Sequence, residues 1–395
     1  MISNKMKRIM DQNAGMASLF TAANILRAKM GDENVFDFTI GNPNMKAPDG
    51  VNETAISILQ NTDSLLIHSY TNPAGMPSVR EAVAKSLNKR FGEEYTGANI
   101  VMTTGAAGGM NAFLKTIIDI GDEVITFSPY FGDYLPYVEN HGGTLVELPP
   151  NPPSFLPDVD AVRAAITEKT KAIIINNPNN PTGVVYGEDV LKEIARLLEE
   201  KEAELGRAVY LISDEPYREL VFDGAVVPYI PKLYKNTIVA YSYSKSLSLP
   251  GDRIGYLTVP SEVEDFAQII EGLSTANRIL GFINAPALQQ MVVGQCCETI
   301  IDVEFYNRNR ELLYNALQEY GFTCAKPEGA FYLFVKAMEE DTFAFSEKAK
   351  EFGLVVIPGE TFGCGGYVRV AYCVSHEMIG RSLPMWKALA ESYQK

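Results

Sequence analysis

The chain is organised around the stretch Thr237–Gly255, which reads TIVAYSYSKSLSLPGDRIG. Its β-branched and aromatic first half predicts a strand that delivers Lys245 to a turn rich in serine, proline and glycine. A strand end holds an amine rigidly, and Ser242, Ser244 and Arg253 offer hydrogen-bond donors to an anionic ligand beside it. A lysine at a strand end is more often an exposed surface charge, so its function has to be argued from the other strands.

The composition predicts a soluble, enzyme-sized protein rather than a nucleic-acid-binding or membrane protein. The 395 residues are 46% hydrophobic, which suits two domains with a sizeable core. The 49 acidic residues outnumber the 34 basic ones, and the net charge of −15 argues against a nucleic-acid partner. Five cysteines without C-x-x-C spacing and three scattered histidines argue against disulfides, a metal site or a Ser-His-Asp triad, and favour the cytoplasm. We expect no signal peptide and no membrane span, because no apolar run approaches about 18 residues.

Strand-like and helical patterns alternate from about residue 100 to residue 260. The strand-like runs lie at 100–104, 123–127, 144–148, 172–175, 209–213, 237–243 and 256–259. This alternation predicts an α/β fold whose mostly parallel, seven-stranded sheet is sandwiched by helices. We assign residues 46–285 to this large domain, and residues 286–395 with an N-terminal arm over 1–45 to a smaller α+β domain. Helical periodicity over 285–319 predicts one continuous helix joining the two domains.

Local signals predict several further boundaries. A helix over 14–30 is expected to end at Gly31, and Ser78 with Glu81 forms a capping box for a helix that ends at Gly92. In the C-terminal part we expect strands at 331–335, 354–357 and 367–371 and a closing helix over 376–391.

Open parallel sheets bind ligands beyond the carboxyl ends of their strands, and several predicted strands end in small or polar residues. After the strand at 100–104, Gly105, Ala106 and Ala107 open a helix whose free amide groups could hold a phosphate. Tight packing of the turn would explain the same residues. The pattern is not G-x-G-x-x-G, and no acidic residue follows about 20 positions later, which argues against a nicotinamide dinucleotide site.

Four other strand ends add chemistry that fits together. Phe131 follows the second strand and could stack on a planar ring or pack in the core. Asn180 lies in an Asn- and Pro-rich loop that can aim an amide at a ligand oxygen. Asp214, at the end of an apolar strand, needs a cationic partner in the protein or on a ligand, and Tyr217 follows three residues later. With the amine of Lys245, this set suits pyridoxal phosphate, which binds through a lysine and accepts electrons.

These motifs resemble those of the fold-type I, class I/II aminotransferases of the aspartate aminotransferase family. The similarity runs from Gly41-Asn42-Pro43 to Tyr367-Val368-Arg369-Val370. It includes Asn-Asn-Pro-Thr-Gly at 179–183, Asp-Glu-x-Tyr at 214–217 and Ser-x-Ser-Lys at 242–245. The resemblance implies a pyridoxal 5′-phosphate enzyme that moves an amino group between an L-amino acid and a 2-oxo acid in a ping-pong reaction.

The resemblance also implies roles for single residues. Lys245 would form the Schiff base with the cofactor, Asp214 would face the pyridine nitrogen, and Asn180 and Tyr217 would bind the phenolic oxygen. Phe131 would be the stacking ring, where many relatives have tryptophan. The phosphate would be held by Gly105, Ala106, Ala107, Ser242, Ser244 and Arg253. Because the two alanines stand where relatives often have a hydroxyl or a lysine, more of the phosphate binding falls to the serines and the arginine.

Substrates and a second subunit enter the same implied site. Arg369 would clamp the substrate α-carboxylate, with Gly41 and Asn180 also touching the substrate. Tyr70 would reach the phosphate of the neighbouring subunit, which implies a homodimer with shared sites. Aspartate with 2-oxoglutarate is the leading substrate pair, and aromatic amino acids or alanine are the alternatives. Arg278 is the nearest candidate for binding a side-chain carboxylate; its other interpretation is an exposed arginine at a helix end.

Two other classes of protein share parts of this pattern. A C–S β-lyase on the same scaffold would use every cofactor residue, but would release pyruvate and ammonia without an oxo-acid acceptor. A cofactor-binding regulatory module is disfavoured, because the aminotransferase pattern begins within the first 40 residues and we expect no added DNA-binding segment.

Overall fold

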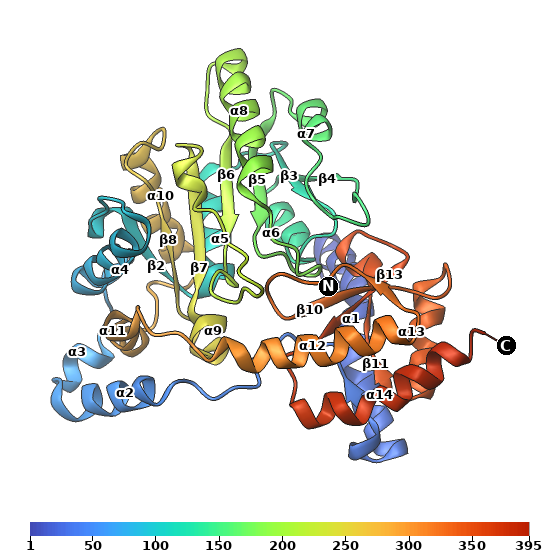
Figure 1. Ribbon diagram of the computed structural model, residues 1–395. Helices are drawn as coiled ribbons and strands as arrows, with labels where there is room; N and C mark the ends of the chain where they lie inside the picture. Colours follow the sequence, from blue (N-terminus) through green and yellow to red (C-terminus); the bar gives the residue numbers. More distant parts are fainter. Residues whose placement is uncertain (395) are drawn as a thin grey trace.

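A seven-stranded sheet forms the centre of the molecule (Figure 1). The computed structural model describes residues 1–394, without the side chains of residues 11–21. The strands of the sheet are β2 (Ile100–Thr103), β3 (Glu123–Phe127), β4 (Thr144–Leu148), β5 (Thr170–Asn176), β6 (Tyr210–Asp214), β7 (Thr237–Ser242) and β8 (Gly255–Thr258). Their order is β2-β8-β7-β6-β5-β3-β4, and β8 is antiparallel to both of its neighbours while β7, β6, β5, β3 and β4 pair in parallel. The predicted mostly parallel α/β sheet is confirmed.

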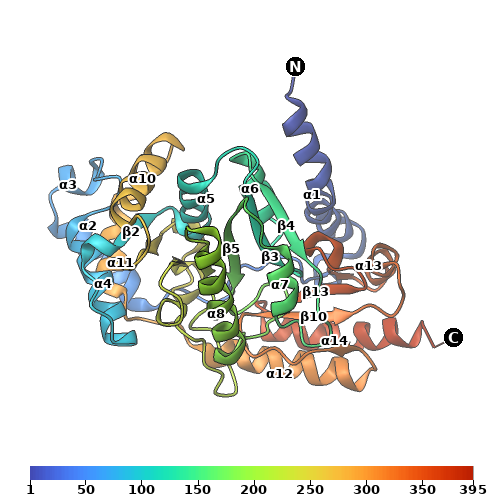
Figure 2. The ribbon, with the colours of Figure 1, turned by 90° about the horizontal axis from the view of Figure 1, so that it is seen from above.

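Helices cover both faces of this sheet, as Figure 2 shows. One face carries α5 (Gly105–Ile117), α6 (Tyr134–Asn140) and α10 (Phe266–Ile279), and the other carries α7 (Val159–Ala165) and α8 (Glu188–Leu205). Successive side chains of a strand point to opposite faces. Val124 therefore packs in one core with Phe113 of α5, while the next residue, Ile125, packs in the other core with Ile194 of α8. Burial on both faces explains the uninterrupted apolar runs of the central strands.

The two ends of the chain form the second part of the molecule. Four strands, β9 (Thr323–Cys324), β10 (Tyr332–Lys336), β12 (Ile357–Pro358) and β13 (Tyr367–Ala371), make an antiparallel sheet in the order β12-β13-β10-β9. In the arm, β1 (Phe36–Asp37) pairs in parallel with β11 (Leu354–Val355). The helices here are α1 (Asn4–Met30), α12 (Val303–Glu319), α13 (Thr342–Glu351) and α14 (His376–Glu391). Trp386 of α14 is fully buried against Phe38 and Phe322, so the arm and the C-terminal segment share one core.

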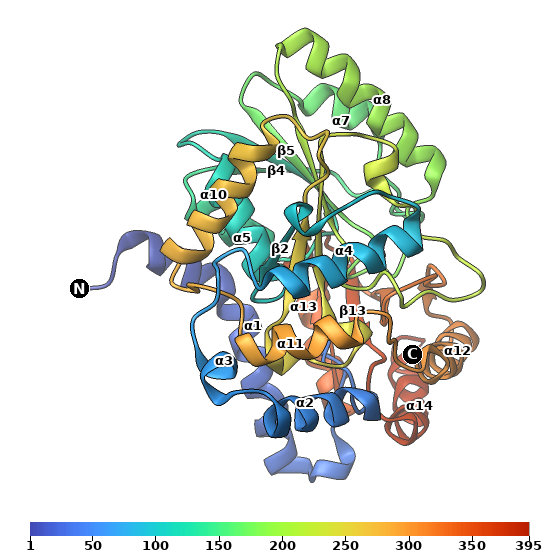
Figure 3. The same ribbon diagram turned by 90° about the vertical axis from the view of Figure 1, so that its left-hand side faces the viewer.

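Two helix predictions are wrong. The expected continuous helix over 285–319 is divided into α11 (Ala287–Cys296) and α12, because Asp302 caps a new helix by accepting a hydrogen bond from the amide of Glu304. Figure 3 shows α11 packed beside α4 (Pro77–Phe91) and α2 (Asp49–Asn61). The expected capping box of Ser78 and Glu81 does not form, because α4 begins at Pro77 and Ser78 lies inside the helix.

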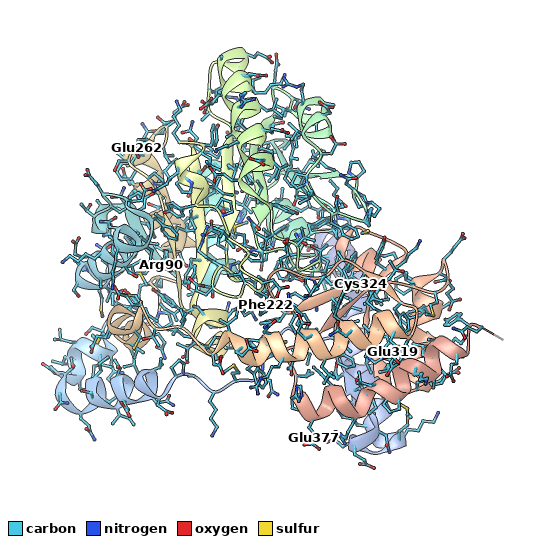
Figure 4. All side chains as sticks on the ribbon, in the orientation of Figure 1. Arg90, Phe222, Glu262, Glu319, Cys324 and Glu377 are labelled. Atoms are coloured by element: carbon cyan, nitrogen blue, oxygen red, sulfur yellow. The ribbon has the colours of Figure 1, made fainter. Side chains whose placement is uncertain are left out.

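The arm helix is longer than expected, because α1 begins at Asn4 rather than near residue 14. In Figure 2 it projects from the molecule with the N terminus at its outer end. All five cysteines lie among the described residues and are free thiols; Cys324 of β9 is labelled in Figure 4. Across residues 1–394, no helix combines the length and apolar character that a membrane span requires.

Candidate active site

The carboxyl ends of the large sheet open onto a cavity of about 330 Å³. Its walls also include Thr39–Gly41 of the arm and residues of β10 and β13 from the smaller sheet. Of the residues predicted for the site, those lining the cavity are Gly41, Ala106, Ala107, Phe131, Asn180, Asp214, Tyr217, Ser242, Ser244, Lys245, Arg253 and Arg369. Gly105 lies directly beside it, whereas Tyr70, with 86% of its surface exposed, is outside it. Arg278 is also exposed and lies outside the cavity, in the last turn of α10.

Lys245 reaches the cavity from a short helix that follows β7. Ser242, the last residue of the strand, accepts a hydrogen bond from the amide of Ser244 and so caps α9 (Tyr243–Ser246). The Lys245 Nζ donates to the carbonyl oxygen of Gly41 at 2.6 Å and lies 5.3 Å from the ring centre of Phe331. Burial lowers the pKa of Lys245 to about 8. Roughly one chain in ten would therefore carry the neutral, nucleophilic amine at pH 7.

Asp214 ends β6 with 6% of its surface exposed. The hydroxyl of Tyr134 donates to Asp214 Oδ2 at 2.5 Å, and Asn176 Nδ2 lies 3.4 Å from the same oxygen. Burial raises the pKa of Asp214 to about 7, although the Tyr134 hydrogen bond opposes the rise. Its other oxygen, Oδ1, has no hydrogen-bond partner among the described residues. A buried, unpaired acceptor of this kind suits a protonated ring nitrogen on a ligand.

Arg369 of β13 presents its guanidinium between two aromatic rings. Its Cζ lies 4.6 Å from the ring centre of Tyr332 and 4.8 Å from that of Phe362. Nη1 donates to Asn180 Oδ1 at 3.0 Å and Nη2 donates to the carbonyl oxygen of Thr39 at 2.7 Å. Nε is buried and lacks a partner within residues 1–394. The stacked and tethered group thus keeps a free donor for an anion, and arginine binds carboxylates particularly well.

Tyr217 and Phe131 line other walls of the cavity. The hydroxyl of Tyr217 lies 2.9 Å from that of Tyr332, and burial, with Tyr332 beside it, raises the pKa of Tyr217 well above its usual value. The ring of Phe131 stands edge-on to Tyr134, with ring centres 5.6 Å apart. A protonated phenol and an apolar ring are suitable neighbours for a planar aromatic ligand with a phenolic oxygen.

Arg253 and the start of α5 form a candidate anion site. Gly105 has a positive φ of 75°, and a Cβ there would lie 3.1 Å from Nη2 of Arg253, so glycine lets the arginine approach the helix start. Arg253 Nη2 lies 3.4 Å from the carbonyl oxygen of Thr104, and the hydroxyls of Ser242 and Ser244 are 2.7 Å apart. Free amide groups at a helix N-terminus, two hydroxyls and an arginine together match a phosphate group.

Sequence reasoning missed several residues of the cavity, and four of them contact predicted site residues through their side chains. Asn176 could have been identified, because it is the last residue of β5 and begins the asparagine-rich loop. Tyr134, at the start of α6, has no local signal that predicts its bond to the carboxylate. Tyr332 and Phe362 come from the smaller sheet and its flanking turn, and tertiary packing alone brings them to the site.

The residues of the cavity fit pyridoxal phosphate. The unpaired Asp214 Oδ1 suits the cofactor's ring nitrogen, and the anion site at Gly105 and Arg253 suits its phosphate. The amine of Lys245 suits its aldehyde, because it has a depressed pKa. Arg369 Nε is left over as a donor for a second anion.

Comparison with known proteins agrees with this chemistry. Residues 33–383 match the family model of the aminotransferases of class I and II. An aspartate/prephenate aminotransferase from Thermus thermophilus is 31% identical over 372 residues, which cover 93% of this chain and 94% of the relative. A crystal structure of an aminotransferase from Eubacterium rectale has a TM-score of 0.96 at 43% identity and covers 100% of this chain and 99% of its own. The aspartate aminotransferase from Thermus thermophilus with maleate has a TM-score of 0.83 at 30% identity, over 95% of this chain and 96% of its own. The chain therefore belongs to the class I and II aminotransferases, pyridoxal-phosphate-dependent enzymes that act on amino acids and 2-oxo acids.

Proposed function

We propose that Lys245 holds the cofactor covalently and that the enzyme transfers amino groups between an L-amino acid and a 2-oxo acid in a ping-pong cycle. One observation carries this proposal: the amine of Lys245, the carboxylate of Asp214 and the guanidinium of Arg369 converge on one cavity. Each of the three has an unusual feature suited to its role. The lysine has a lowered pKa, and the other two each have a buried polar atom without a partner among the described residues.

The proposed roles follow from the positions of these side chains. Pyridoxal phosphate supplies an aldehyde that condenses with amines and a ring that accepts electrons. Asp214 Oδ1 holds a proton on the ring nitrogen, because a cation there favours the ionised carboxylate. With the cofactor bound, Lys245 Nζ would be freed when the substrate amine takes its place, and would move the proton from the substrate Cα to the cofactor's carbon, or back in the reverse half-reaction. Asn180 and Tyr217 orient the phenolic side of the ring, and Phe131 packs on its face.

The remaining proposed roles concern binding. Arg369 holds the α-carboxylate through its free Nε, which keeps the Cα–H bond within reach of Lys245. Gly41 contacts the substrate through its backbone. The phosphate is held by Gly105, Ala106, Ala107, Ser242, Ser244 and Arg253. Because the two alanines provide backbone groups alone, the charge of the phosphate is balanced mainly by Arg253.

For substrates, we propose aspartate as amino donor with 2-oxoglutarate as acceptor. Support comes from the Thermus thermophilus relatives, one named an aspartate/prephenate aminotransferase and one crystallised with maleate, a dicarboxylate. The described cations that line the cavity are Lys245, Arg253 and Arg369, and each already has a role. A side-chain carboxylate would therefore need a further cation, such as Arg278 contributed by a second subunit. Aromatic amino acids or alanine are the alternative substrates.

We further propose a homodimer in the cytoplasm. The 86% exposure of Tyr70, which lies outside the cavity of its own chain, is consistent with a side chain that reaches the phosphate of a neighbouring subunit. Free thiols at all five cysteines suit a reducing compartment. We keep residues 46–285 as the large domain and residues 1–45 with 286–395 as the small one. The pairing of β1 with β11 supports this division.

A half-reaction tests the proposal. The purified holoenzyme is mixed with single amino acids, without an acceptor, and the visible absorbance of the cofactor is followed. We expect one equivalent of oxo acid and conversion of the cofactor to its amine form, fastest with aspartate. Continuous release of pyruvate and ammonia would instead indicate the C–S β-lyase.

The variant Lys245→Ala tests the catalytic role. It should bind pyridoxal phosphate without covalent attachment and lose at least about a hundredfold in transfer rate, because proton transfer by a positioned base contributes at least that much. Lys235→Ala is the matched control, since this exposed lysine lies just before β7 and pairs with Glu202. Full activity in Lys245→Ala would refute the assignment.

A further inference from the structure

Tyr332 touches three residues of the proposed machinery from one position. It begins β10 and has 2% of its surface exposed. Its hydroxyl oxygen lies 2.9 Å from that of Tyr217, and its ring centre lies 4.6 Å from the Cζ of Arg369. A Cβ added to Gly41 would lie 2.1 Å from the same hydroxyl oxygen. One side chain of the smaller sheet thus contacts the tyrosine proposed to bind the phenolic oxygen and the arginine proposed to bind the substrate carboxylate. It also contacts the glycine whose carbonyl accepts a hydrogen bond from Lys245.

We propose that Tyr332 is a positioning residue whose hydroxyl orients the Tyr217 proton toward the cofactor and whose ring supports the Arg369 guanidinium. The inference rests on the proposed function, because it concerns residues of the same site. It gives the two parts of Tyr332 different roles: the hydroxyl positions Tyr217 on the cofactor side of the site, and the ring positions Arg369 on the substrate side.

The contact between the two buried hydroxyls carries the first half of the argument. If Tyr332 donates to Tyr217, the proton of Tyr217 is free to point into the cavity. Burial raises the pKa of Tyr332 to about 12, and the positive charge of Arg369 opposes the rise. Burial, with Tyr332 beside it, also raises the pKa of Tyr217 well above its usual value. Both phenols therefore stay protonated near neutral pH, and with Tyr332 as the donor the two hydroxyls, 2.9 Å apart, form a chain that ends at the ligand, in which each bond strengthens the next.

Gly41 supplies the second half. The φ of Gly41 is not positive, so its backbone conformation does not require glycine. Glycine is required there because the Tyr332 hydroxyl occupies the space that a Cβ would take. The carbonyl of Gly41 accepts a hydrogen bond from Lys245 Nζ at 2.6 Å. By packing directly on Gly41, Tyr332 therefore also fixes the oxygen against which the reactive amine rests.

The test separates the oxygen from the ring. In Tyr332→Phe, the pH midpoint of the holoenzyme's visible absorbance should rise by about half a pH unit, because a weaker donor at the phenolic oxygen favours the protonated cofactor. The KM for the amino donor should change less than about twofold, since the ring remains. In Tyr332→Leu, the same KM should rise about tenfold, because Arg369 loses an aromatic face.

A matched control removes a similar hydroxyl elsewhere. Tyr95 is buried, and its hydroxyl accepts a hydrogen bond from Tyr229 at 3.2 Å, away from the residues that line the cavity. Tyr95→Phe should leave the absorbance midpoint and the KM unchanged. An equal shift of the absorbance midpoint in Tyr95→Phe and in Tyr332→Phe would show that the loss of any buried hydroxyl has this effect. That result would overturn the proposal.

A second readout does not depend on the cofactor. Gly41→Ala should lower the melting temperature of the cofactor-free protein in the natural background, because the new methyl group meets the Tyr332 hydroxyl. In the Tyr332→Phe background, at least half of that loss should disappear. An equal loss in both backgrounds would contradict the contact.

The outcomes also separate this inference from the proposed function. If the natural enzyme forms no oxo acid from any amino acid, the proposed function fails, whatever Tyr332 does. If the natural enzyme transfers amino groups and Tyr332→Phe has an unchanged absorbance midpoint, the positioning role fails alone. Failure of Tyr332→Phe to fold would make the hydroxyl a structural group and would likewise overturn it.

Discussion

The buried carboxyl of Asp214 suits cofactor binding, but its ionisation should lower the stability of the cofactor-free chain. The variant Asp214→Asn should reveal this effect. Burial raises the pKa of Asp214 from 3.8 to about 7. Between these two values the folded chain keeps a proton that the unfolded chain releases. Stability from this group is therefore greatest below about pH 4 and is lost as the pH rises through 7.

The size of the effect follows from the pKa difference. Three pKa units at about 1.4 kcal/mol each give a loss of about 4 kcal/mol between pH 4 and pH 8. Asparagine does not ionise, so Asp214→Asn removes this pH dependence. The amide nitrogen of the variant would itself be buried beside the cavity, which costs about 1–3 kcal/mol at every pH and does not alter the slope.

Urea unfolding of the cofactor-free proteins between pH 5 and pH 8.5 measures the prediction. The natural chain should lose stability with rising pH, and Asp214→Asn should lose much less while also losing transfer activity. Asp223→Asn is the control, because Arg310 and Lys326 lower the pKa of Asp223 to about 2, outside this pH range. Parallel pH slopes for the natural chain and Asp214→Asn would refute the argument that a buried carboxyl is being ionised.

Three further predictions concern Arg369, Arg253 and Lys245, the described cations of the cavity, with Arg278 outside it as a comparison. Arg369→Gln should raise the KM of aspartate and alanine alike by about 10- to 100-fold in steady-state kinetics, whereas Arg278→Gln should raise that of aspartate alone if a second subunit uses it. Arg253→Gln should weaken binding of pyridoxal phosphate by about 10- to 100-fold, with little change for pyridoxal, in a fluorescence titration; equal losses for both ligands would contradict its phosphate role. The rate at which the cofactor is trapped covalently on Lys245 should rise with pH, reach half of its maximum near pH 8 and level off about one unit higher; a rate that is half-maximal only above about pH 10 would show an ordinary lysine.

The sheet and most of the site could be predicted because both depend on local sequence. Strands β3, β4 and β13 have the predicted bounds, since each is a short apolar or alternating run between turn residues. Parallel topology then places the ends of these strands together, so Asp214 and Lys245 could be placed at one edge before their contacts were known. The buried environment that shifts their pKa values is a tertiary property and has no local signature.

Two of the residues that were missed, Tyr134 and Tyr332, owe their positions to long-range contacts. Tyr134 is 80 residues from Asp214, and Tyr332 is 115 residues from Tyr217. Neither the helical nor the strand periodicity of a sequence predicts contacts over such distances along the chain. The division of the expected helix over 285–319 is a different kind of error, because the capping residue Asp302 was visible in the sequence and was outweighed by apolar periodicity.

The arm segment Thr39–Gly41 shows why the effect of Arg369 on substrate binding should be moderate. In the chain without ligand, the carbonyl of Thr39 accepts from Arg369, and the carbonyl of Gly41 accepts from Lys245. A hydrogen bond that involves a charged group is worth about 1.5–3 kcal/mol, and the bond from the Arg369 guanidinium to the Thr39 carbonyl is already of this kind. A substrate carboxylate that binds the free Nε and also replaces the Thr39 carbonyl at Nη2 therefore gains less than the full strength of two new bonds. These two hydrogen bonds keep Arg369 and Lys245 from being unpaired buried charges in the chain without ligand. An unpaired buried charge would cost more free energy than the substrate affinity that is lost.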